Sequence, residues 1–414
     1  MYHRVTETQS PSLIGGVELS IFFERRKFMT VSIGPSEVKC VIGLMSGTSM
    51  DGVDAAMIFT DGERVERLGP SLTVSYPSEV RERIREGLNI AASCTKDGDV
   101  PAEIKDLERE ITDWHSHAIE ELLSVTGQKA STVDLVGFHG QTLTHRPDRG
   151  WTWQIGDGGR LAGHTGIPVV NDFRSADVAA GGEGAPLTPL YHAALLQRER
   201  RHETVAILNI GGVANVSWVS FTGSESDPKI VAFDTGPGNA MLDDWAQIHT
   251  DKSYDEDGEL AARGICHEEV VLGLMASPYF DETPPKSLDR DDFNIQSVRG
   301  LSTEDGAATL TDFVVESIIS AQSHFPAPPE AWYICGGGRL NKTLMRRLRR
   351  RLPVLADPVE VLGWRGDALE AEAFAFLAAR SVRGLPITLP GTTGCAQPTT
   401  GGVLHKPTRM PFRR

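Results

Sequence analysis

Short, continuously apolar runs alternate along the chain with longer amphipathic stretches, which is the pattern of an α/β protein. The apolar runs predict buried strands within residues 40–42, 53–59, 133–140, 168–170, 204–220, 230–239 and 331–341. The clearest helix is predicted to open at Pro101, because apolar residues then recur at spacings of three and four: Ile104, Leu107, Ile111, Trp114, Ala118 and Leu122. A second amphipathic helix is predicted over residues 344–352, with a solvated arginine face.

Most of these predicted strands end in glycine together with Asp, Asn or Ser. Because ligands of α/β sheets bind beyond the carboxyl ends of the strands, the loops are expected to converge on one cleft. The run at 133–140 is expected to end in a glycine turn, which would place His139, Gln141 and Thr142 at or beyond the end of that strand.

The first of these loops lies in "GLMSGTSMDGVD" (residues 43–54) and is richer in hydroxyls than a tight turn requires. Glycine lets backbone N–H groups approach a phosphate, Ser and Thr hydroxyls donate to its oxygens, and an acid can hold Mg²⁺ through water. All three are supplied here, by Ser46, Gly47, Thr48, Ser49 and Asp51, with Asp51 the candidate Mg²⁺ ligand. A polar hairpin that only turns the chain is an equal alternative on these residues alone.

Two later segments repeat the glycine pattern: "LNIGGVANVSWVS" (208–220) is a second strand–loop–strand unit, and "CGGGRLN" (335–341) joins a strand to a helix. There is no GxxxxGK[ST] loop of a P-loop NTPase. Together the three segments resemble the actin, hexokinase and heat-shock ATPase superfamily. The resemblance implies a two-lobed, ribonuclease H-like α/β fold with ATP in the interdomain cleft. It also implies the ATP-binding residues Gly47, Thr48, Ser49, Met50, Asp51, Gly52, Val53, Asp54, Asn209, Gly211, Gly212, Gly336, Gly337, Gly338 and Asn341.

Length, charge and cysteine content limit the possible domain organisation, partners and cellular location. At 414 residues the chain is too long for one compact core and suits two domains. A net charge of −15 argues against a nucleic-acid partner, which would need a basic face. No run approaches the roughly 20 apolar residues of a membrane span. The five cysteines lie far apart without a CxxC pair, so neither a disulfide scaffold nor a metal clip is expected, and a reducing cytoplasm fits best.

Two lobes are therefore expected. The first comprises residues 38–168 and 384–414 with the first phosphate loop. The second comprises residues 169–383 with the second phosphate loop and the adenosine segment. Residues 1–37 are expected to be a disordered extension or the product of a misplaced start, with Met29 as the alternative first residue.

A narrower resemblance covers about residues 40–408. Its blocks are "GLMSGTSMDGVD", "GFHGQTLTHRP", "QIGDGGRLA", "NDFRSADVAAGGEGAPLTP", "LNIGGVANVS", "FDTGPGNAMLD", "CGGGRLN", "EAEAFAFLA" and "TTGCAQPTTGGVL", in this order. Together they resemble the anhydro-N-acetylmuramic acid kinases of bacterial peptidoglycan recycling. The resemblance implies a homodimer that uses ATP and Mg²⁺ to open 1,6-anhydro-N-acetylmuramic acid with water and to phosphorylate O6.

The resemblance also carries over two catalytic acids. Asp234 of "FDTGPGN" matches the family's catalytic aspartate, which would take a proton from the attacking water. Glu370 of "LEAEAFAF" matches the acid that helps position that water. The bare sequence leaves alternatives open: Asp234 could cap the following helix, and Glu370 could be a solvent-facing helix residue.

Substrate contacts are expected from His139, Gln141, Thr142 and Arg174, although a structural role in the loop is open for the first three. Arg174 could bind the lactyl carboxylate of the sugar, or it could form an internal ion pair with Asp172 or Asp177, which the sequence favours. Lys286 is given no specific role.

The chain departs from the family pattern at two places. Glu183 stands where the family more often has Gln, and "KSLDRD" (286–291) stands for its usual "KSTGRE". An added carboxylate beside the sugar could weaken binding or change selectivity. A kinase of the same fold for another sugar or polyol is therefore the alternative, and an ATP-binding actin-like or chaperone-like module is a third hypothesis.

Overall fold

The computed structural model describes residues 37–47, 49–221, 227–290 and 292–407. The predicted extension lies outside the described residues, apart from Glu37. One compact unit comprises Glu37–Arg414. Its strands are β1 (Lys39–Ser46), β2 (Gly52–Thr60), β3 (Val65–Ser75), β4 (Leu135–Arg146), β5 (Trp151–Ile155), β6 (Val169–Asn171), β7 (Val205–Ile210), β8 (Val213–Ser220), β9 (Lys229–Pro237), β10 (Ala331–Cys335), β11 (Leu355–Pro358) and β12 (Val403–His405).

The strands form two sheets that share the order of five strands, β6-β4-β1-β2-β3 in the first and β11-β10-β7-β8-β9 in the second. In the first, the order is β12-β6-β4-β1-β2-β3, with β5 also paired to β4; in the second, it is β11-β10-β7-β8-β9. Each sheet contains an antiparallel meander, β1-β2-β3 or β7-β8-β9, whose first strand then pairs in parallel with β4 or β10. This duplicated α/β topology is the actin-like ATPase fold that the sequence predicts.

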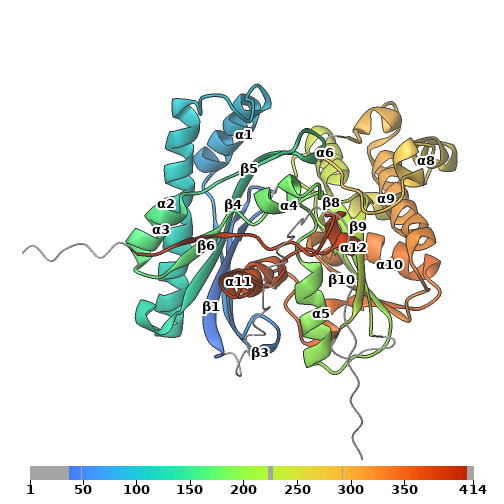
Figure 1. Ribbon diagram of the computed structural model, residues 1–414. Helices are drawn as coiled ribbons and strands as arrows, with labels where there is room; N and C mark the ends of the chain where they lie inside the picture. Colours follow the sequence, from blue (N-terminus) through green and yellow to red (C-terminus); the bar gives the residue numbers. More distant parts are fainter. Residues whose placement is uncertain (1–36, 48, 222–226, 291, 408–414) are drawn as a thin grey trace, which may run out of the picture. The chain divides into compact units, whose positions relative to one another are not determined.

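Helices cover both faces of each sheet (Figure 1). They are α1 (Ser78–Ala92), α2 (Ala102–Thr126), α3 (Gly158–Thr165), α4 (Ser175–Ala179), α5 (Pro189–Arg198), α6 (Ala240–His249), α7 (Glu259–Arg263), α8 (Glu268–Met275), α9 (Thr303–Ser320), α10 (Lys342–Arg351), α11 (Leu369–Val382) and α12 (Pro390–Thr393). Among the described residues, no helix is both long enough and apolar enough to span a bilayer.

The apolar core has three parts, because alternate residues of a strand face opposite sides of its sheet. Ile42 of β1 packs with α1 and α2 on the outer side of the first sheet, and Leu208 of β7 packs with α6 and α9 on the outer side of the second. Val41 and Ile207 belong to a central core that also holds α5 and α11. These two helices lie between the sheets (Figure 1).

Two glycines let α11 pack directly on the backbone of the first sheet. A Cβ added to Gly43 would lie 1.7 Å from the Ala371 carbonyl oxygen, and one added to Gly137 would lie 2.1 Å from the Phe374 carbonyl oxygen. Any side chain at either position would push α11 away from β1 and β4. Glu370 lies in the first turn of this helix, so these contacts fix where its backbone stands.

Most predicted elements are confirmed. Both glycine hairpins are present, as β1–β2 and β7–β8, and the two amphipathic helices are α2 and α10. The predicted end of the strand at Gly140 is wrong, because β4 continues to Arg146. Gly140 has a φ of +77°, and a Cβ there would meet the Ile155 carbonyl oxygen of β5 at 2.3 Å. Glycine thus allows β4 to continue and pair with β5.

The division into two lobes stays a prediction. Within the described residues, β6 pairs with β4, and α11 packs on β1, so both lie on the first sheet although their residues fall in the predicted second lobe. The short strand β12, from the C-terminal residues predicted to return to the first lobe, pairs antiparallel with β6.

Candidate active site

Asp234 lies near the end of β9 and is 8% exposed. Its carboxylate Oδ2 accepts a hydrogen bond from the Leu288 backbone N–H at 2.9 Å. Its own backbone is held on both sides, since its N–H donates to the Lys286 carbonyl at 3.0 Å and its carbonyl accepts from the Tyr279 hydroxyl at 2.5 Å. The direction of this carboxylate is therefore set by the backbone of two segments.

The surroundings of Asp234 make it a weaker acid than an aspartate in water. Burial raises the pKa of Asp234 to about 7, against the lowering effects of the Leu288 N–H and the Arg174 guanidinium. The negative charges of Glu183 and Asp289 raise it further. A carboxylate with a pKa near neutrality is suited to general-base work, because proton transfer is most efficient when the pKa lies near the working pH.

Glu370 is brought toward the same place from α11. Burial raises the pKa of Glu370, and the Arg174 guanidinium opposes that shift. In the described part of the chain, no hydrogen bond to the Glu370 carboxylate is found. Arg174 is within electrostatic reach of both acids, since Glu370 and Asp234 each favour its charged form. Arg174 therefore acts electrostatically on both predicted acids.

His139 holds Arg174 in place. Arg174 Nε donates to His139 Nε2 at 3.1 Å, which leaves His139 Nδ1 to donate to the Gly140 carbonyl at 2.8 Å. This network assigns a neutral imidazole, and burial keeps the pKa of His139 well below its usual value. The guanidinium also donates to the Gly184 carbonyl at 2.7 Å.

Gln141 connects β4 to the first hairpin. Its Oε1 accepts from the Ser46 hydroxyl at 2.7 Å, and its Nε2 donates to the Gly47 carbonyl at 3.3 Å. The Tyr76 hydroxyl donates to Ser46 from the other side at 3.1 Å. Thr142, the next residue of β4, accepts from Gln154 Nε2 at 3.3 Å. Gln141 thus supports the hairpin, whereas a sugar contact by either residue stays a prediction.

The first hairpin exposes its polar tip. Ser49 and Asp51 are exposed and hydrogen-bonded to each other at 2.7 Å, whereas Gly52 and Val53 are buried at the start of β2. Met50 has a φ of +54°. The predicted residue Thr48 lies outside the described residues. Hydroxyl and carboxylate oxygens at this tip therefore face solvent.

Asp54 lies deeper in the same hairpin and accepts from the Thr73 hydroxyl at 2.5 Å. Burial raises the pKa of Asp54 to about 7 against this hydrogen bond, and the charges of Asp51 and Glu370 add to the rise. The first hairpin and the start of α11 are therefore within electrostatic reach of each other.

The second hairpin is shorter, and the carbonyl groups of its two glycines accept hydrogen bonds from backbone N–H groups. The Gly211 carbonyl accepts from Asn239 N–H at 2.7 Å, and the Gly212 carbonyl accepts from Gly238 N–H at 2.9 Å. Asn209 lies at the end of β7, where it pairs with Cys335 of β10. These contacts join the hairpin to the start of α6 and to the segment that follows β10.

That segment is the predicted adenosine site. A Cβ added to Gly336, with φ +75°, would lie 2.3 Å from Asn209 Oδ1, and one at Gly338 would lie 2.4 Å from Ile210 Cγ2. Gly337 is exposed. The Asn341 side chain accepts from Thr343 and Leu344 N–H and so caps α10. Gly336 and Gly338 therefore have a packing role, whatever they bind.

The chain was compared with known proteins. Residues 39–407 match the sequence profile of the family "Anhydro-N-acetylmuramic acid kinase". The chain belongs to the anhydro-N-acetylmuramic acid kinase family. A member from Rhizorhabdus wittichii is 50% identical over 366 residues, which are 88% of this chain and 98% of that protein. A member from Rhodospirillum rubrum is 51% identical over 361 residues, 87% of this chain and 92% of that protein.

Solved structures give weaker likenesses. A ROK family glucokinase from Streptomyces griseus, in complex with glucose and AMPPNP, has a TM-score of 0.38 and 14% identity, covering 82% of this chain and 99% of that one. A dehydratase activator from Clostridium difficile with bound ADPNP has a TM-score of 0.39 and 16% identity, covering 83% and 97%. At such TM-scores, neither likeness supports a conclusion about the site.

Two of the alternatives left open by the sequence are wrong. Asp234 does not cap the helix that follows, since it lies within β9 and α6 begins only at Ala240. Arg174 forms no ion pair with Asp172 or Asp177 in the described structure. Asp177 instead accepts hydrogen bonds from Gly184 N–H and from the hydroxyls of Thr388 and Thr393. It anchors the C-terminal segment to the loop after α4.

Sequence reasoning singled out Lys286 and Glu183 but did not place them beside Asp234, and it missed Leu288 altogether. Leu288 acts through its backbone N–H, which no residue-type pattern reveals. Lys286 is buried, with its ammonium over the Tyr279 ring at 4.3 Å and bonded to the Tyr279 carbonyl at 2.7 Å. Glu183, a departure from the pattern of the anhydro-N-acetylmuramic acid kinase family, lies close enough to raise the pKa of Asp234.

The residues present fit a bound nucleotide with Mg²⁺. A Cβ at Gly47 would meet only Ser49 within 4 Å, the Oγ atom at 3.6 Å, so the fold itself does not require glycine there. That space lets a phosphate approach the backbone. The described residues contain no cluster of three side chains that could hold a metal ion.

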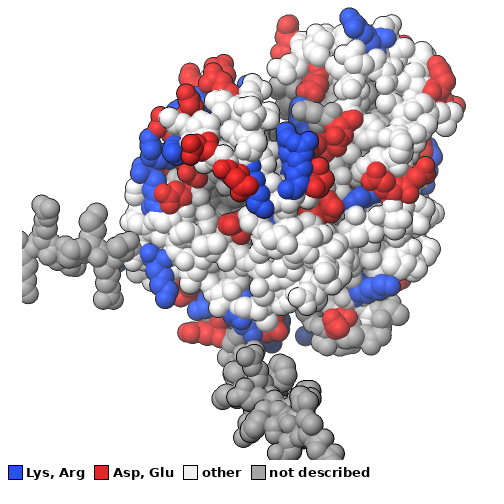
Figure 2. Space-filling model, turned by 45° about the horizontal axis from the view of Figure 1, so that its top comes forward, with Lys and Arg blue, Asp and Glu red and all other residues white. Residues whose placement is uncertain are grey.

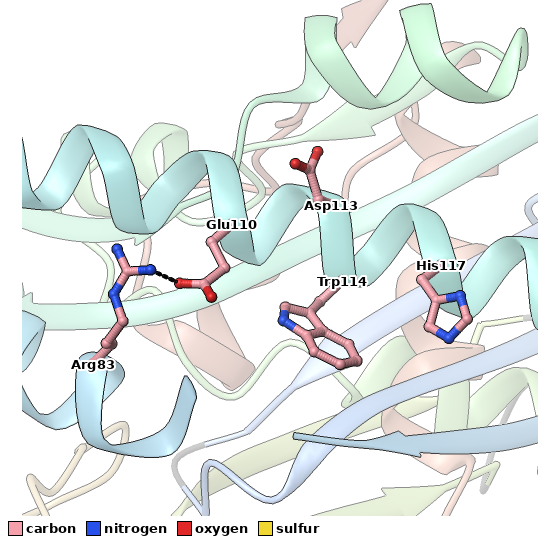
Figure 3. Close-up of a pocket in the computed structure, with 5 residues that line it drawn as sticks. All are labelled: Arg83, Glu110, Asp113, Trp114 and His117. Carbon is pink, nitrogen blue, oxygen red and sulfur yellow. Dashed lines mark hydrogen bonds and ion pairs between the residues drawn. The ribbon is translucent and has the colours of Figure 1, made fainter. Parts of the chain in front are cut away.

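Two of the cavities among the described residues differ in their relation to the site. One of about 440 Å³ lies between α1 and α2, where Figure 3 shows the Arg83–Glu110 ion pair beside Asp113, Trp114 and His117. None of the predicted site residues lines it. A second cavity of about 300 Å³ is lined by Asp54, Ser71, Leu72, Thr73, Glu360, Trp364, Arg365, Gly366, Asp367 and Ala368. On the face shown in Figure 2, acidic and basic side chains are interspersed, and neither sign forms a continuous patch.

Proposed function

We propose that the protein opens the 1,6-anhydro bridge of 1,6-anhydro-N-acetylmuramic acid with water and transfers the γ-phosphate of ATP to O6, which gives N-acetylmuramic acid 6-phosphate. Membership of the anhydro-N-acetylmuramic acid kinase family over residues 39–407 supports this activity. The structural observation that carries it is a buried Asp234, held by a backbone N–H and within electrostatic reach of Arg174, whose charge also acts on Glu370.

The bicyclic sugar has no free 6-hydroxyl, so phosphorylation requires the C1–O6 bond to break. The oxygen of water forms a bond to C1, and Asp234 takes the proton that the water loses. O6 leaves C1 with its electron pair and forms a bond to the γ-phosphorus, while the bond from that phosphorus to ADP breaks. A positioned base of this kind contributes typically about 10²–10⁴ in rate.

Glu370 and Arg174 act on the same water and sugar. Glu370 lies within electrostatic reach of Arg174 and orients the attacking water with its carboxylate. Arg174, held by His139 and Gly184, favours the ionised form of both acids and presents its remaining N–H groups to an anionic substrate. Substrate contacts by His139, Gln141 and Thr142 belong to the same proposal.

ATP would be held by the two hairpins and the segment after β10. The Gly47 backbone has room for a phosphate, and exposed Ser49 adds a hydroxyl. Asp51 would hold Mg²⁺ through water, and the ion would supply charge neutralisation at the phosphates. The proposal completes this site with the other predicted ATP-binding residues: Thr48, Met50, Gly52, Val53, Asp54, Asn209, Gly211, Gly212, Gly336, Gly337, Gly338 and Asn341.

Three further expectations stay predictions: a homodimer, a cytoplasmic location and the lack of a nucleic-acid partner. The competing function, phosphorylation of an ordinary sugar or polyol by the same fold, is not favoured by the family match.

A coupled assay of ADP release separates these functions. We expect turnover with 1,6-anhydro-N-acetylmuramic acid, and little with N-acetylmuramic acid or N-acetylglucosamine. Preference for a sugar without the anhydro bridge would reject the proposed reaction and support the alternative kinase. ATP turnover that no sugar changes would point to an actin-like or chaperone-like module instead.

A further inference from the structure

Residues 286–290, which we call the strap, cross the site beside Asp234 and are held at each end. At the start, the Lys286 carbonyl accepts from the Asp234 N–H. At the end, Arg290 donates to the Asp244 carboxylate of α6 at 2.7 Å. Between these anchors, Leu288 presents its backbone N–H to the Asp234 carboxylate.

One side chain of the strap contacts a second acid. The Ser287 hydroxyl donates to Glu183 Oε2 at 2.7 Å, one residue before the Leu288 N–H that contacts Asp234. Glu183 stands on a fixed loop, because its own N–H donates to the Thr393 carbonyl at 2.6 Å and the next N–H, of Gly184, donates to buried Asp177. Neighbouring strap residues thus hold two carboxylates.

We propose that the Glu183–Ser287 hydrogen bond is a positioning device for the catalytic base: it fixes the strap so that the Leu288 N–H meets Asp234, and it sets a second negative charge beside that base. The inference rests on the proposed function, since a base that takes a proton from water is what the device would serve.

The Leu288 N–H and the Glu183 carboxylate shift the pKa of Asp234 in opposite directions. The Leu288 N–H stabilises ionised Asp234 and lowers its pKa, whereas the charge of Glu183 destabilises it and raises the pKa. The other charged and titratable groups that face Asp234 are Arg174 and Asp289, and the Tyr279 hydroxyl contacts its carbonyl. Substituting Glu183 leaves all of these groups in place, whereas Asp289 lies on the strap and moves with it when Ser287 is substituted.

The test compares two substitutions. Glu183→Gln keeps an oxygen for the Ser287 hydroxyl and removes the charge, so we expect the acidic-limb pKa of kcat/KM to fall by about half a unit to one unit. Its kcat at pH 8.5 should stay within about threefold of the parent. Glu120→Gln, on the exposed face of α2, is the matched control and should leave the profile unchanged.

Ser287→Ala keeps the charge and releases the strap. The acidic-limb pKa should therefore rise, and kcat should fall by about tenfold while KM changes little, because the base loses its orientation. Hydrogen–deuterium exchange of the strap should be faster in this variant. Shifts of the same sign in both variants, or an unchanged profile in both, would overturn the proposal.

A direct titration keeps this test separate from the proposed function. The carboxyl ¹³C signal of Asp234, assigned by its loss in Asp234→Asn, should titrate at lower pH in Glu183→Gln and at higher pH in Ser287→Ala. These opposite shifts would support the positioning device even if the sugar assay failed. Parent-like titration in both variants, with normal activity on the anhydro sugar, would reject the device alone.

Discussion

Asp234 and Glu370 are the same chemical group on two different supports. Asp234 stands on a strand of the second sheet, where its backbone and its carboxylate are held by hydrogen bonds from residues 279–288. Glu370 stands on the first turn of α11, and its position follows from the seat of that helix on Gly43 and Gly137 of the first sheet. The charge of Arg174 acts on both.

The two acids are positioned in different ways. Hydrogen bonds to the Asp234 carboxylate fix its direction, as proton transfer requires. The packing of α11 on the first sheet fixes only the backbone from which the Glu370 side chain extends. The difference agrees with the roles proposed above, in which Asp234 takes the proton and Glu370 orients the water.

Asp234→Asn should have the largest effect. The amide keeps the shape and can accept from the Leu288 N–H, but it cannot take a proton. We expect kcat to fall by about 10³-fold, with the dissociation constant for ATP unchanged within about twofold, measured by ADP release and by calorimetry. Near-normal turnover of this variant would show that Asp234 is not the general base.

The same variant should be more stable than the parent at pH 8. Because burial raises the pKa of Asp234 from 3.8 to about 7, the stability linked to its proton is fully present below 3.8 and is lost as the pH rises through about 7. Asn has no such loss. Urea unfolding at pH 5 and pH 8 measures the difference, which should be larger at pH 8.

Gly43→Ala should disrupt the packing of α11, the helix that carries Glu370, on β1. Its Cβ would lie 1.7 Å from the Ala371 carbonyl, so α11 must shift, at a cost of about 2–3 kcal/mol in the free energy of unfolding. Gly163→Ala in α3 is the control, since a Cβ there meets nothing within 4 Å and should stabilise the helix. Equal unfolding midpoints for the two variants would contradict the inference that Gly43 is needed for the packing of α11.

Glu370→Gln should lower kcat by about 10- to 50-fold, less than Asp234→Asn, because the water loses orientation but the base remains. Glu372→Gln is its comparator on the same helix. Glu372 is buried and paired with Arg365 and the Tyr191 hydroxyl, so its loss should reduce stability rather than kcat. A greater loss of kcat for Glu370→Gln than for Asp234→Asn would reverse the assignment.

Gly47→Ala should have the smallest effect and should touch neither acid. A Cβ at this position meets only Ser49 Oγ at 3.6 Å, so unfolding should change by less than about 0.5 kcal/mol. The KM for ATP should rise by about three- to tenfold, because the methyl group occupies space next to the phosphates. An altered pH profile of kcat would show that the hairpin and the acids are coupled.

Much of the fold could be predicted because local patterns determine it. The apolar periodicity of α2, the apolar run of β1 and the glycines of the hairpins each act within a few residues. The continuation of β4 past Gly140 depends on pairing with β5, which the strand's own residues do not reveal. The Leu288 N–H and the seat of α11 likewise depend on contacts between segments far apart in the sequence.

The central core has a consequence for how the protein is made. The inner face of the first sheet is covered by α11, whose residues follow almost the whole chain. During synthesis, strands β1 to β6 leave the ribosome well before residues 369–382 exist, so their apolar inner face stays open to water and to other nascent chains. Complete folding of the first sheet must therefore wait until α11 has been synthesised.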